Sequence, residues 1–404
     1  MFWIRRTLCM AAALFVIGCS DDNGEPDAGG DVEYVADAAD VASDAERDAL
    51  SDADSGDEPV RFDLDGEPCE LFEAHGPYTV GLHDVELDDG TALAVFYPAA
   101  DADAESDVEY DMRDFLPEED RDQISDEDAP TFAIDAVSEA TASDDGPFPL
   151  VLFSHGLAGY RFQSSTLLAH LASWGFVVAS AEHEERNLSH ILESTLPDGD
   201  DAPETLREMI QFFQAHDGDS TSPFFQLVDL SQIAATGHSM GGNGAVSMIG
   251  EPGVEAAIFY ASNPGVDEAS DVELFWQGGT TDELVSMSQI RGEYESSPPT
   301  KRLLGIEGAG HLAFSDICVI GAEDGGVLQI ASDSGMDIPP LILELGQDGC
   351  RDTDLDVEIA WPIIHHYSVA HLRSAFGIDD EPVGLADATV GCYADHTELE
   401  WAAE

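Results

Sequence analysis

The chain has 404 residues and a formal net charge of -70, because 84 Asp and Glu residues stand against 14 Lys and Arg residues. This length accommodates one domain on the order of 200 to 300 residues with additional tails. This excess of negative charge repels nucleic acid and anionic membrane surfaces, so neither is an expected partner. Because the acids are spread along the whole chain, we interpret them as a solvated coat suited to a salty medium.

Residues 1–18 have the features of an export signal. Arg5 and Arg6 precede an apolar segment, residues 8–17, that is too short to span a bilayer as a helix. The segment ends in Val-Ile-Gly-Cys19, which resembles a bacterial lipobox and implies cleavage before Cys19 and lipidation of that residue. The alternative is an ordinary signal peptide with a chance cysteine. We expect an exported protein anchored by lipid to a bacterial membrane, on its periplasmic or cell-surface face.

Residues 19–60 are predicted to form a disordered acidic tether. They are mainly Asp, Ala, Gly and Ser, and such a composition cannot bury enough apolar surface to offset the entropy lost on ordering. The folded domain is expected over residues 61–400. Its first two strands, residues 78–87 and 91–97, flank an Asp-Asp-Gly turn and predict an antiparallel hairpin. We interpret the acidic stretch at 101–146 as a surface excursion rather than core, although it can still lie near a site.

Strand and helix patterns alternate from residue 149 onward. Buried strands are expected at residues 149–154, 176–181, 233–236, 254–260, 273–277 and 302–306, and helices at 162–174, 203–215 and 357–376. Pro362 is expected to interrupt the last helix early. This alternation predicts an α/β fold, with a mostly parallel central sheet and helices on both faces.

The predicted strand at 233–236 leads into the sequence Gly-His-Ser239-Met-Gly. In this G-x-S-x-G pattern the serine lies exposed on a tight strand-to-helix turn, where side chains at the glycine positions would collide with neighbouring backbone. The following helix points N–H groups and the positive end of its dipole at an oxyanion formed there. A glycine-rich turn that merely contains serine is the alternative, and the context favours Ser239 as a nucleophile.

A serine nucleophile needs a base and a carboxylate that orients the base, here in the chain order Ser, Asp or Glu, His. His311 follows the last expected parallel strand in a glycine-rich loop that can reach the serine, so we predict it as the base. Asp282 follows the strand at 273–277 and is predicted to hold His311, although it could equally cap a helix. Asp267 and Glu268, on the loop after the preceding strand, are the alternatives.

Four other histidines fit a catalytic role less well. His365, His366 and His371 lie on the last expected helix, at a spacing that does not suit a metal pair, and we interpret them as packing or surface residues. His238 adjoins the nucleophile, and this adjacency is expected to direct its side chain elsewhere.

The oxyanion hole requires the N–H of the residue after the nucleophile and one N–H from the loop after an earlier strand. Met240 is the first donor by position. The second is expected in the loop FSHGLAG at residues 153–159, where we choose Leu157, with Ala158 as the alternative.

Four cysteines remain once Cys9 is removed with the signal and Cys19 is lipidated. In an exported protein they indicate two disulfides, for which three connectivities exist. We predict Cys318–Cys350, which closes the irregular segment after His311, and Cys69–Cys392, which ties the two ends of the domain. No C-x-x-C spacing is present, so no zinc site is expected.

Residues 149–376 resemble α/β-hydrolases of the platelet-activating-factor acetylhydrolase type. The resemblance lies in HGLAGYR at 155–161, LASWGFVVASAEH at 171–183, GHSMGG at 237–242 and GHLAFSD at 310–316. It implies a serine esterase that acts on short acyl esters without a metal, with oxyanion donors that map onto Leu157 and Met240. GHSMGG and the architecture after it also resemble bacterial cutinases and polyester hydrolases.

The chain departs from each of these groups at one place. The acetylhydrolases carry their acid one strand earlier, where this chain has Tyr-Ala-Ser-Asn at 260–263 and no carboxylate. The polyester hydrolases have an aromatic residue where this chain has Leu157. The departures bear on the substrate rather than on the class of reaction.

From these patterns we expect a monomeric serine carboxylester hydrolase that needs no cofactor and no metal. It is expected to act through an acyl-enzyme on small-molecule or lipid esters with short to medium acyl chains, and to meet the membrane only through its N-terminal lipid. Leu157, Tyr160 and Phe162 are candidates to line an acyl pocket. The alternatives are a cutinase-like polyester depolymerase and a catalytically silent surface-binding lipoprotein.

Overall fold

The computed structural model describes residues 71–100, 105–194, 199–266, 271–379, 382–385, 393 and 396–402. All of them belong to one compact unit, Asp57–Glu404. The predicted signal, tether and lipidated Cys19 lie outside the described residues. In the part that is described, no helix is both long enough and apolar enough to cross a membrane.

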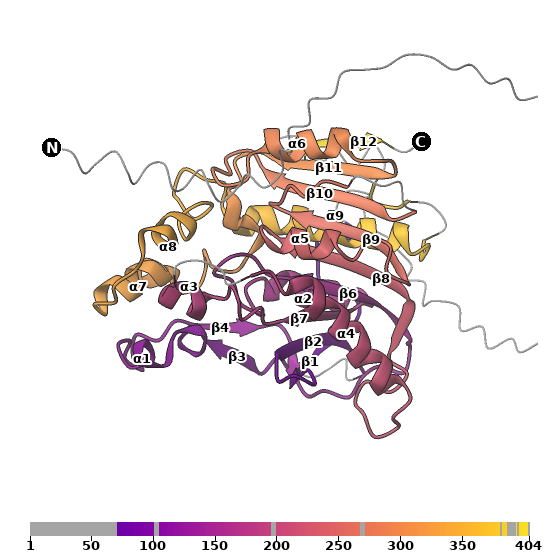
Figure 1. Cartoon of the computed structure of the whole chain (residues 1–404), viewed down its shortest axis with the longest axis horizontal. Coiled ribbons are helices and arrows are strands. Elements are labelled where there is room, and N and C mark those ends of the chain that lie inside the picture. Colours follow the sequence, from indigo (N-terminus) through magenta and orange to yellow (C-terminus); the bar gives the residue numbers. More distant parts are fainter. Residues whose placement is uncertain are drawn as a thin grey trace, which may run out of the picture. The chain divides into compact units, whose positions relative to one another are not determined.

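A ten-stranded sheet organises the described chain (Figure 1). Its parallel centre consists of β6 (Phe148–Ser154), β7 (Val177–Ala181), β8 (Val228–His238), β9 (Val254–Tyr260), β10 (Glu273–Gly279) and β11 (Lys301–Ile306). Its flanks are β1 (Thr79–Glu86), β2 (Ala92–Ala99), β5 (Val137–Ser138) and β12 (Thr397–Ala402). The strand order is β12-β11-β10-β9-β8-β6-β7-β2-β1-β5. The hairpin expected from the first two strand patterns is confirmed, since β1 pairs with β2 antiparallel.

Helices cover both faces of the sheet because side chains alternate along the buried strands. On β6, Val151 and Phe153 join the apolar layer of α2 (Ser165–Ser173) and α9 (Val357–Ala375). Leu150 and Leu152 point the other way and join the layer of α4 (Ala202–Asp217), α5 (Gly241–Val246) and α6 (Met287–Ser296). The α/β fold is therefore confirmed. One detail differs, because α9 continues through Pro362 instead of being interrupted there.

The acidic stretch that was expected outside the core contributes to it. It contains β3 (Val108–Asp111), η2 (Met112–Phe115), α1 (Glu118–Arg121) and β4 (Thr131–Ile134), and β3 pairs with β4. Tyr110, Met112, Phe115 and Ile134 are buried in the apolar layer that contains α2. The expectation of a surface excursion is wrong for these residues, because their apolar side chains turn inward from between the acids.

A second excursion follows β11. It contains η3 (His311–Phe314), η4 (Ala322–Asp324), α7 (Val327–Asp333) and α8 (Pro340–Leu345), and ends where α9 begins. In Figure 1, α7 and α8 lie with α1 and α3 (Leu188–Ser194) on one side of the sheet. We call residues 318–350 the α7–α8 excursion.

Candidate active site

Ser239 lies on a strained turn between β8, which ends at His238, and α5, which begins at Gly241. Its φ of 54° falls in the left-handed region that non-glycine residues rarely adopt. A Cβ at Gly237 would collide with the carbonyl of Gly241, and a Cβ at Gly241 with the carbonyl of Ser154. The two glycines of the motif therefore allow the backbone contacts that hold the serine in place.

The three residues predicted as nucleophile, base and acid meet at the carboxyl ends of β8, β10 and β11. His311 Nε2 lies 2.9 Å from Ser239 Oγ, and His311 Nδ1 lies 2.9 Å from Asp282 Oδ2. Because a carboxylate accepts hydrogen bonds, we assign the ring proton to Nδ1, which donates to Asp282. Nε2 is then unprotonated and can accept the serine proton. The alternative acids at 267 and 268 lie outside the described residues.

Asp282 contacts His311 as predicted, whereas the helix cap considered as its alternative role belongs to Ser286, the N-cap of α6. While Oδ2 faces His311, Oδ1 accepts hydrogen bonds from the N–H groups of Leu284 at 2.8 Å and Val285 at 2.7 Å. The carboxylate is buried, with 5% of the residue exposed. It therefore caps a turn and orients the base with its two separate oxygens.

Asp348, which sequence reasoning missed, joins the loops that carry the base and the acid. Its Oδ1 accepts the N–H of His311 at 3.2 Å, and its Oδ2 accepts the N–H of Glu283 at 2.9 Å. Its own carbonyl accepts the N–H of Leu312 at 2.7 Å. Burial raises the pKa of Asp348, and the N–H groups of His311 and Glu283 oppose that shift by stabilising the carboxylate. The contacts span 37 and 65 residues, so no local sequence pattern reveals them.

His238 stays at the site, contrary to expectation, because its ring turns from the end of β8 toward the loop of the base. Its Nε2 donates to the carbonyl of His311 at 3.0 Å, and its Nδ1 accepts from Gln163 Nε2 at 3.0 Å. Burial, together with the neighbouring His311, lowers the pKa of His238 to about 3, so the imidazole is neutral. Gln163 and His238 thus form a second support for the base, also absent from the sequence prediction.

The backbone distinguishes between the two candidates for the second oxyanion donor. Ala158, with φ 56°, donates its N–H to the carbonyl of Arg186 at 2.8 Å and is therefore engaged. The N–H groups of Leu157 and Met240 donate to no other described residue. Leu157 also lines the cavity beside Ser239. The geometry favours Leu157 over Ala158, as the sequence analysis chose.

An apolar cavity of about 130 Å³ adjoins Ser239 and His311. Its walls come mainly from the acidic stretch (Met112, Leu116, Ile124), α3 (Leu188, Leu192) and the α7–α8 excursion (Val327, Leu328, Ile342, Leu345). Among the described residues that line it, none is Asp, Glu, Lys or Arg. Leu157 and Tyr160 line the cavity as expected. Phe162 does not, because its ring stacks on Tyr110 with centroids 5.5 Å apart.

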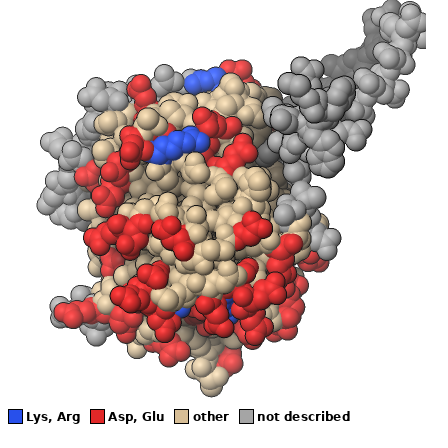
Figure 2. All heavy atoms as spheres, turned by 90° about the vertical axis from the view of Figure 1, so that its left-hand side faces the viewer, with Lys and Arg blue, Asp and Glu red and all other residues tan. Residues whose placement is uncertain are grey.

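The surface beyond this cavity is acidic. Figure 2 shows the side of the molecule on which Figure 1 places α1, α3, α7 and α8. Acidic side chains are scattered widely over this face around uncharged areas, with few basic ones among them. The uncharged lining of the cavity therefore contrasts with the charge outside it.

The disulfide Cys318–Cys350 is present and joins residues 32 apart in the sequence. It ties the chain just after η3 to the residue that follows Asp348 and Gly349. The bridge thus closes the α7–α8 excursion beside the loop of the base. The other predicted pair, Cys69–Cys392, lies outside the described residues.

The histidines of α9 pack inside the fold. His365, His366 and His371 are buried, and the His365 ring stacks on His170 with centroids 4.2 Å apart. The packing interpretation is therefore correct, and the surface alternative is wrong. Among the described residues, no group of three or more His, Cys, Asp or Glu side chains converges as a metal site.

Fold and site together define an α/β-hydrolase, because a parallel sheet presents a serine on a nucleophile elbow, with acid and base on the loops after two later strands. Residues 67–222 match the family model described as platelet-activating factor acetylhydrolase, isoform II. The match supports the resemblance seen in the sequence: residues 67–222 are similar to the platelet-activating factor acetylhydrolase group of α/β-hydrolases. This family suggests a serine esterase or related hydrolase. The matched region includes Leu157 but ends before Ser239, so the roles of the three triad residues are argued from their own geometry.

Proposed function

We propose that this protein is an exported, lipid-anchored serine carboxylester hydrolase that acts on short-to-medium acyl esters, lipid esters included. The observation that carries the proposal is the continuous chain of contacts Asp282–His311–Ser239, at 2.9 Å per step. The N–H groups of Leu157 and Met240 have no other partner among the described residues; Met240 follows Ser239 in the chain, and Leu157 lines the same cavity as Ser239. A binding protein that merely uses the fold has no need of this arrangement.

The reaction follows from the positions of these groups. Ser239 Oγ attacks the ester carbonyl carbon while its proton passes to His311 Nε2, and the oxyanion accepts hydrogen bonds from Leu157 and Met240. His311 then gives this proton to the leaving alkoxide, and an alcohol departs from the acyl-enzyme. Water attacks the acyl carbon with His311 again as base, and collapse of the second tetrahedral intermediate returns the proton to Ser239 and releases the acid.

The cavity indicates which part of the substrate it receives. Its walls are apolar, and its volume of about 130 Å³ is close to that of cavities of about 150 Å³ that admit a benzene-sized group. A short acyl chain fits this space and replaces water there, whereas a charged group would lose its hydration without a partner. We therefore place the acyl group in the cavity and the alcohol toward the surface.

Hydrolysis of p-nitrophenyl esters with acyl chains of rising length tests this proposal. We expect kcat/KM to be highest for short and medium chains, and Ser239→Ala to abolish turnover without lowering the melting temperature. Ser231→Ala is a matched control, because that serine is exposed at the other end of the same strand and should keep wild-type turnover.

Two outcomes would support the alternatives. Release of soluble products from a polyester film, at rates above those for small esters, would favour the depolymerase. Absence of ester hydrolysis by the wild-type chain would favour the silent lipoprotein.

A further inference from the structure

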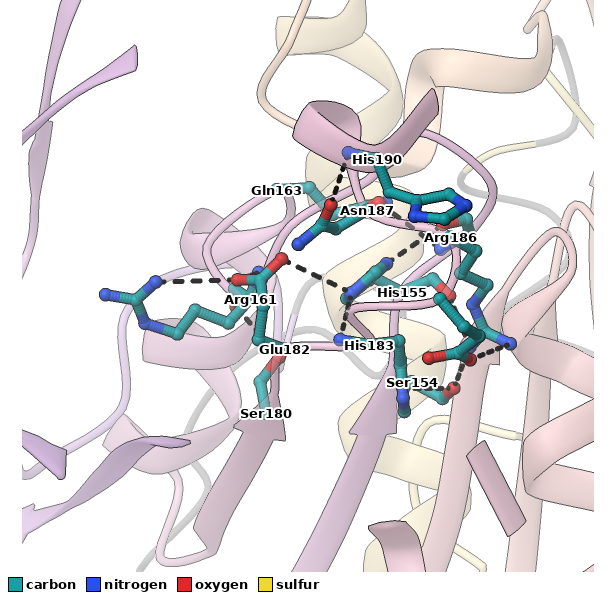
Figure 3. Close-up of polar contacts among 12 residues, drawn as sticks. Ser154, His155, Arg161, Gln163, Ser180, Glu182, His183, Arg186, Asn187 and His190 are labelled. Carbon is teal, nitrogen blue, oxygen red and sulfur yellow. Dashed lines mark hydrogen bonds and ion pairs between the residues drawn. The ribbon is translucent and has the colours of Figure 1, made fainter. Parts of the chain in front are cut away.

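The segment after β7 holds the loop that carries the proposed oxyanion donor (Figure 3). We call residues 154–161 the oxyanion loop and residues 182–188 the clamp segment. Four hydrogen bonds from backbone N–H groups join them: His183 N–H to His155 Nε2 at 2.9 Å, Arg161 N–H to Glu182 Oε2 at 3.2 Å, Ala158 N–H to Arg186 O at 2.8 Å, and Leu188 N–H to Gly159 O at 2.9 Å. The beginning, turn and end of the oxyanion loop are thus all held by one stretch of chain.

Arg186 makes three hydrogen bonds with the oxyanion loop. Its guanidinium donates through Nη2 to Ser154 Oγ at 2.8 Å and to the carbonyl of His155 at 2.9 Å. Its backbone carbonyl accepts the N–H of Ala158. The side chain therefore fixes where the loop leaves β6, and the main chain fixes the turn. Figure 3 shows the guanidinium directed toward the loop from the clamp segment.

Burying this guanidinium is unfavourable for the fold. The residue is 0% exposed, burial lowers the pKa of Arg186, and its Nε finds no partner among the described residues. Asp200 Oδ1 at 3.1 Å offsets part of the desolvation, although that carboxylate is itself 39% exposed. A buried ion pair of this kind is weak evidence for stability, because apolar residues of similar volume often do as well. Its contacts with the oxyanion loop point to a different role.

Arg186 holds the turn at Ala158 in a backbone conformation that alanine rarely adopts. Ala158 has a φ of 56°, a left-handed conformation that persists in a non-glycine residue only where its surroundings fix it. With the Ala158 N–H bound to Arg186, the preceding N–H, that of Leu157, is left without a partner among the described residues. A small rotation of this turn would move the Leu157 N–H away from the substrate oxygen.

We propose that Arg186 is a positioning residue that fixes the oxyanion loop so that the Leu157 N–H, and not the Ala158 N–H, faces the oxyanion. The proposal rests on the esterase function proposed above. It predicts that Arg186 acts on the transition state more than on the bound substrate, because the oxyanion hydrogen bond is strongest when the carbonyl oxygen is charged.

The test compares Arg186→Lys and Arg186→Met with the wild-type chain. The lysine ammonium cannot span Ser154 Oγ, the His155 carbonyl and Asp200 as the planar guanidinium does, and methionine has no donor. Neither variant should therefore hold the oxyanion loop in its wild-type position. Arg207→Met is the matched control, because Arg207 on α4 pairs with Glu251 at 2.6 Å and donates to the carbonyl of Pro203, and neither partner belongs to the site. The readouts are kcat and KM for a short p-nitrophenyl ester and the inhibition constant of a trifluoromethyl ketone. Addition of Ser239 to this ketone creates an oxyanion.

For both Arg186 variants we expect kcat per active site to fall about ten- to hundredfold, the range between a misplaced and a deleted oxyanion donor. KM should change by less than about threefold, because the hydrogen bond from Leu157 is weak in the bound substrate and strong only in the transition state. Affinity for the ketone should fall by the same factor as kcat/KM. A fluorophosphonate titration counts active sites, so a loss of folded protein is not mistaken for a loss of rate. Arg207→Met should match the wild type in kcat, KM, affinity for the ketone and number of active sites.

Wild-type kcat and ketone affinity in a folded Arg186→Lys variant would overturn the proposal. A lower melting temperature with unchanged kcat per active site would also overturn it, because Arg186 would then be only structural. If the Arg186 variants do not fold, Ser154→Ala removes one acceptor of the guanidinium, and it should lower kcat and ketone affinity together by several-fold. Unchanged values in Ser154→Ala would then count against the proposal. Failure of the esterase function shows separately, as a wild-type chain without turnover or as an active Ser239→Ala.

Discussion

Asp282 Oδ2 and His311 Nδ1 are 2.9 Å apart, although the two residues belong to loops after different strands. β10 and β11 pair in parallel, so the loops that follow them leave the same edge of the sheet. The other oxygen of Asp282 is held by two backbone N–H groups and cannot turn away. The pairing of the strands therefore sets the position of the acid, and the turn sets its orientation.

Asp282→Asn should reduce kcat by several orders of magnitude, about 10⁴-fold, because an amide in this place stabilises the wrong tautomer of the base. Steady-state hydrolysis of a short p-nitrophenyl ester measures this effect. Asp267→Asn is the matched comparison and should have little effect on kcat. If Asp267→Asn is the more damaging substitution, the acid comes from the loop after β9 instead.

Replacing both Cys318 and Cys350 by Ser should lower the free energy of unfolding by about 3 to 4 kcal/mol, the chain-entropy estimate for a loop of this size. Urea unfolding of the oxidised protein measures the difference. kcat should also fall, because Asp348 lies two residues from Cys350 and holds the backbone of His311.

Reductant provides the control for the disulfide prediction. It should lower the stability of the wild-type chain toward that of the double variant and leave the double variant itself unchanged. Equal stabilities of the oxidised wild-type chain and the double variant would show that the bridge does not constrain the unfolded chain.

Acid should weaken the fold through its buried histidines. Burial lowers the pKa of His155 and His238 to about 3 and that of His170 and His366 to about 4. Because these values lie below the ordinary value of about 6.5, the stabilisation is complete above pH 6.5 and is lost as the pH falls toward 4 to 3. Burial raises the pKa of Asp316 to about 6 and also raises that of Asp348 and Glu182, and these carboxyl groups act in the opposite direction.

His365→Phe isolates one histidine from these opposing contributions. Burial holds the pKa of His365 well below its ordinary value, and its Nε2 has no hydrogen-bond partner among the described residues. Below pH 6 the wild-type free energy of unfolding should fall more steeply than that of the variant, by about 1.4 kcal/mol per pH unit. Tyr367→Phe on the same helix is the control and should leave the slope unchanged. Parallel curves for the wild type and His365→Phe would contradict the prediction.

Cys19→Ala should release the protein from membranes or block its maturation, because the proposed lipid can no longer be attached. Fractionation of cells that express the variant measures the first effect, and the specific activity of the released protein should equal that of the wild type. Retention of Cys19→Ala in the membrane fraction would exclude the lipobox interpretation.

The sequence predicted the elements whose pattern is local. The parallel strands are apolar runs because they are buried on both faces, and Ser239 stands in a motif whose glycines have a direct steric purpose. β12 was missed because two of the six residues in its sequence, TELEWA, are glutamates. The inward turn of the acidic stretch was missed because charge dominates its composition.

The supports of the site escaped sequence reasoning for another reason. Asp348, Gln163 and His238 act through hydrogen bonds to residues 37 to 75 positions away, and such contacts leave no periodicity in the chain. Single polar residues in loops have many uses, so their partners become evident only when the strands are in place. Ser239, Asp282 and His311 could be predicted to meet because they follow strands in a set order along the chain.

The walls of the cavity come largely from segments outside the central sheet, the acidic stretch and the α7–α8 excursion, whereas Ser239, Asp282 and His311 stand on the sheet's own loops. The two excursions each leave and rejoin the scaffold, and one is closed by its own disulfide. Insertions and replacements in them alter the cavity without displacing a reacting group, provided that Asp348, which holds the backbone of His311, and the bridge are kept. Exchange of these parts can therefore reshape the cavity while the loops that carry Ser239, Asp282 and His311 stay where the sheet holds them.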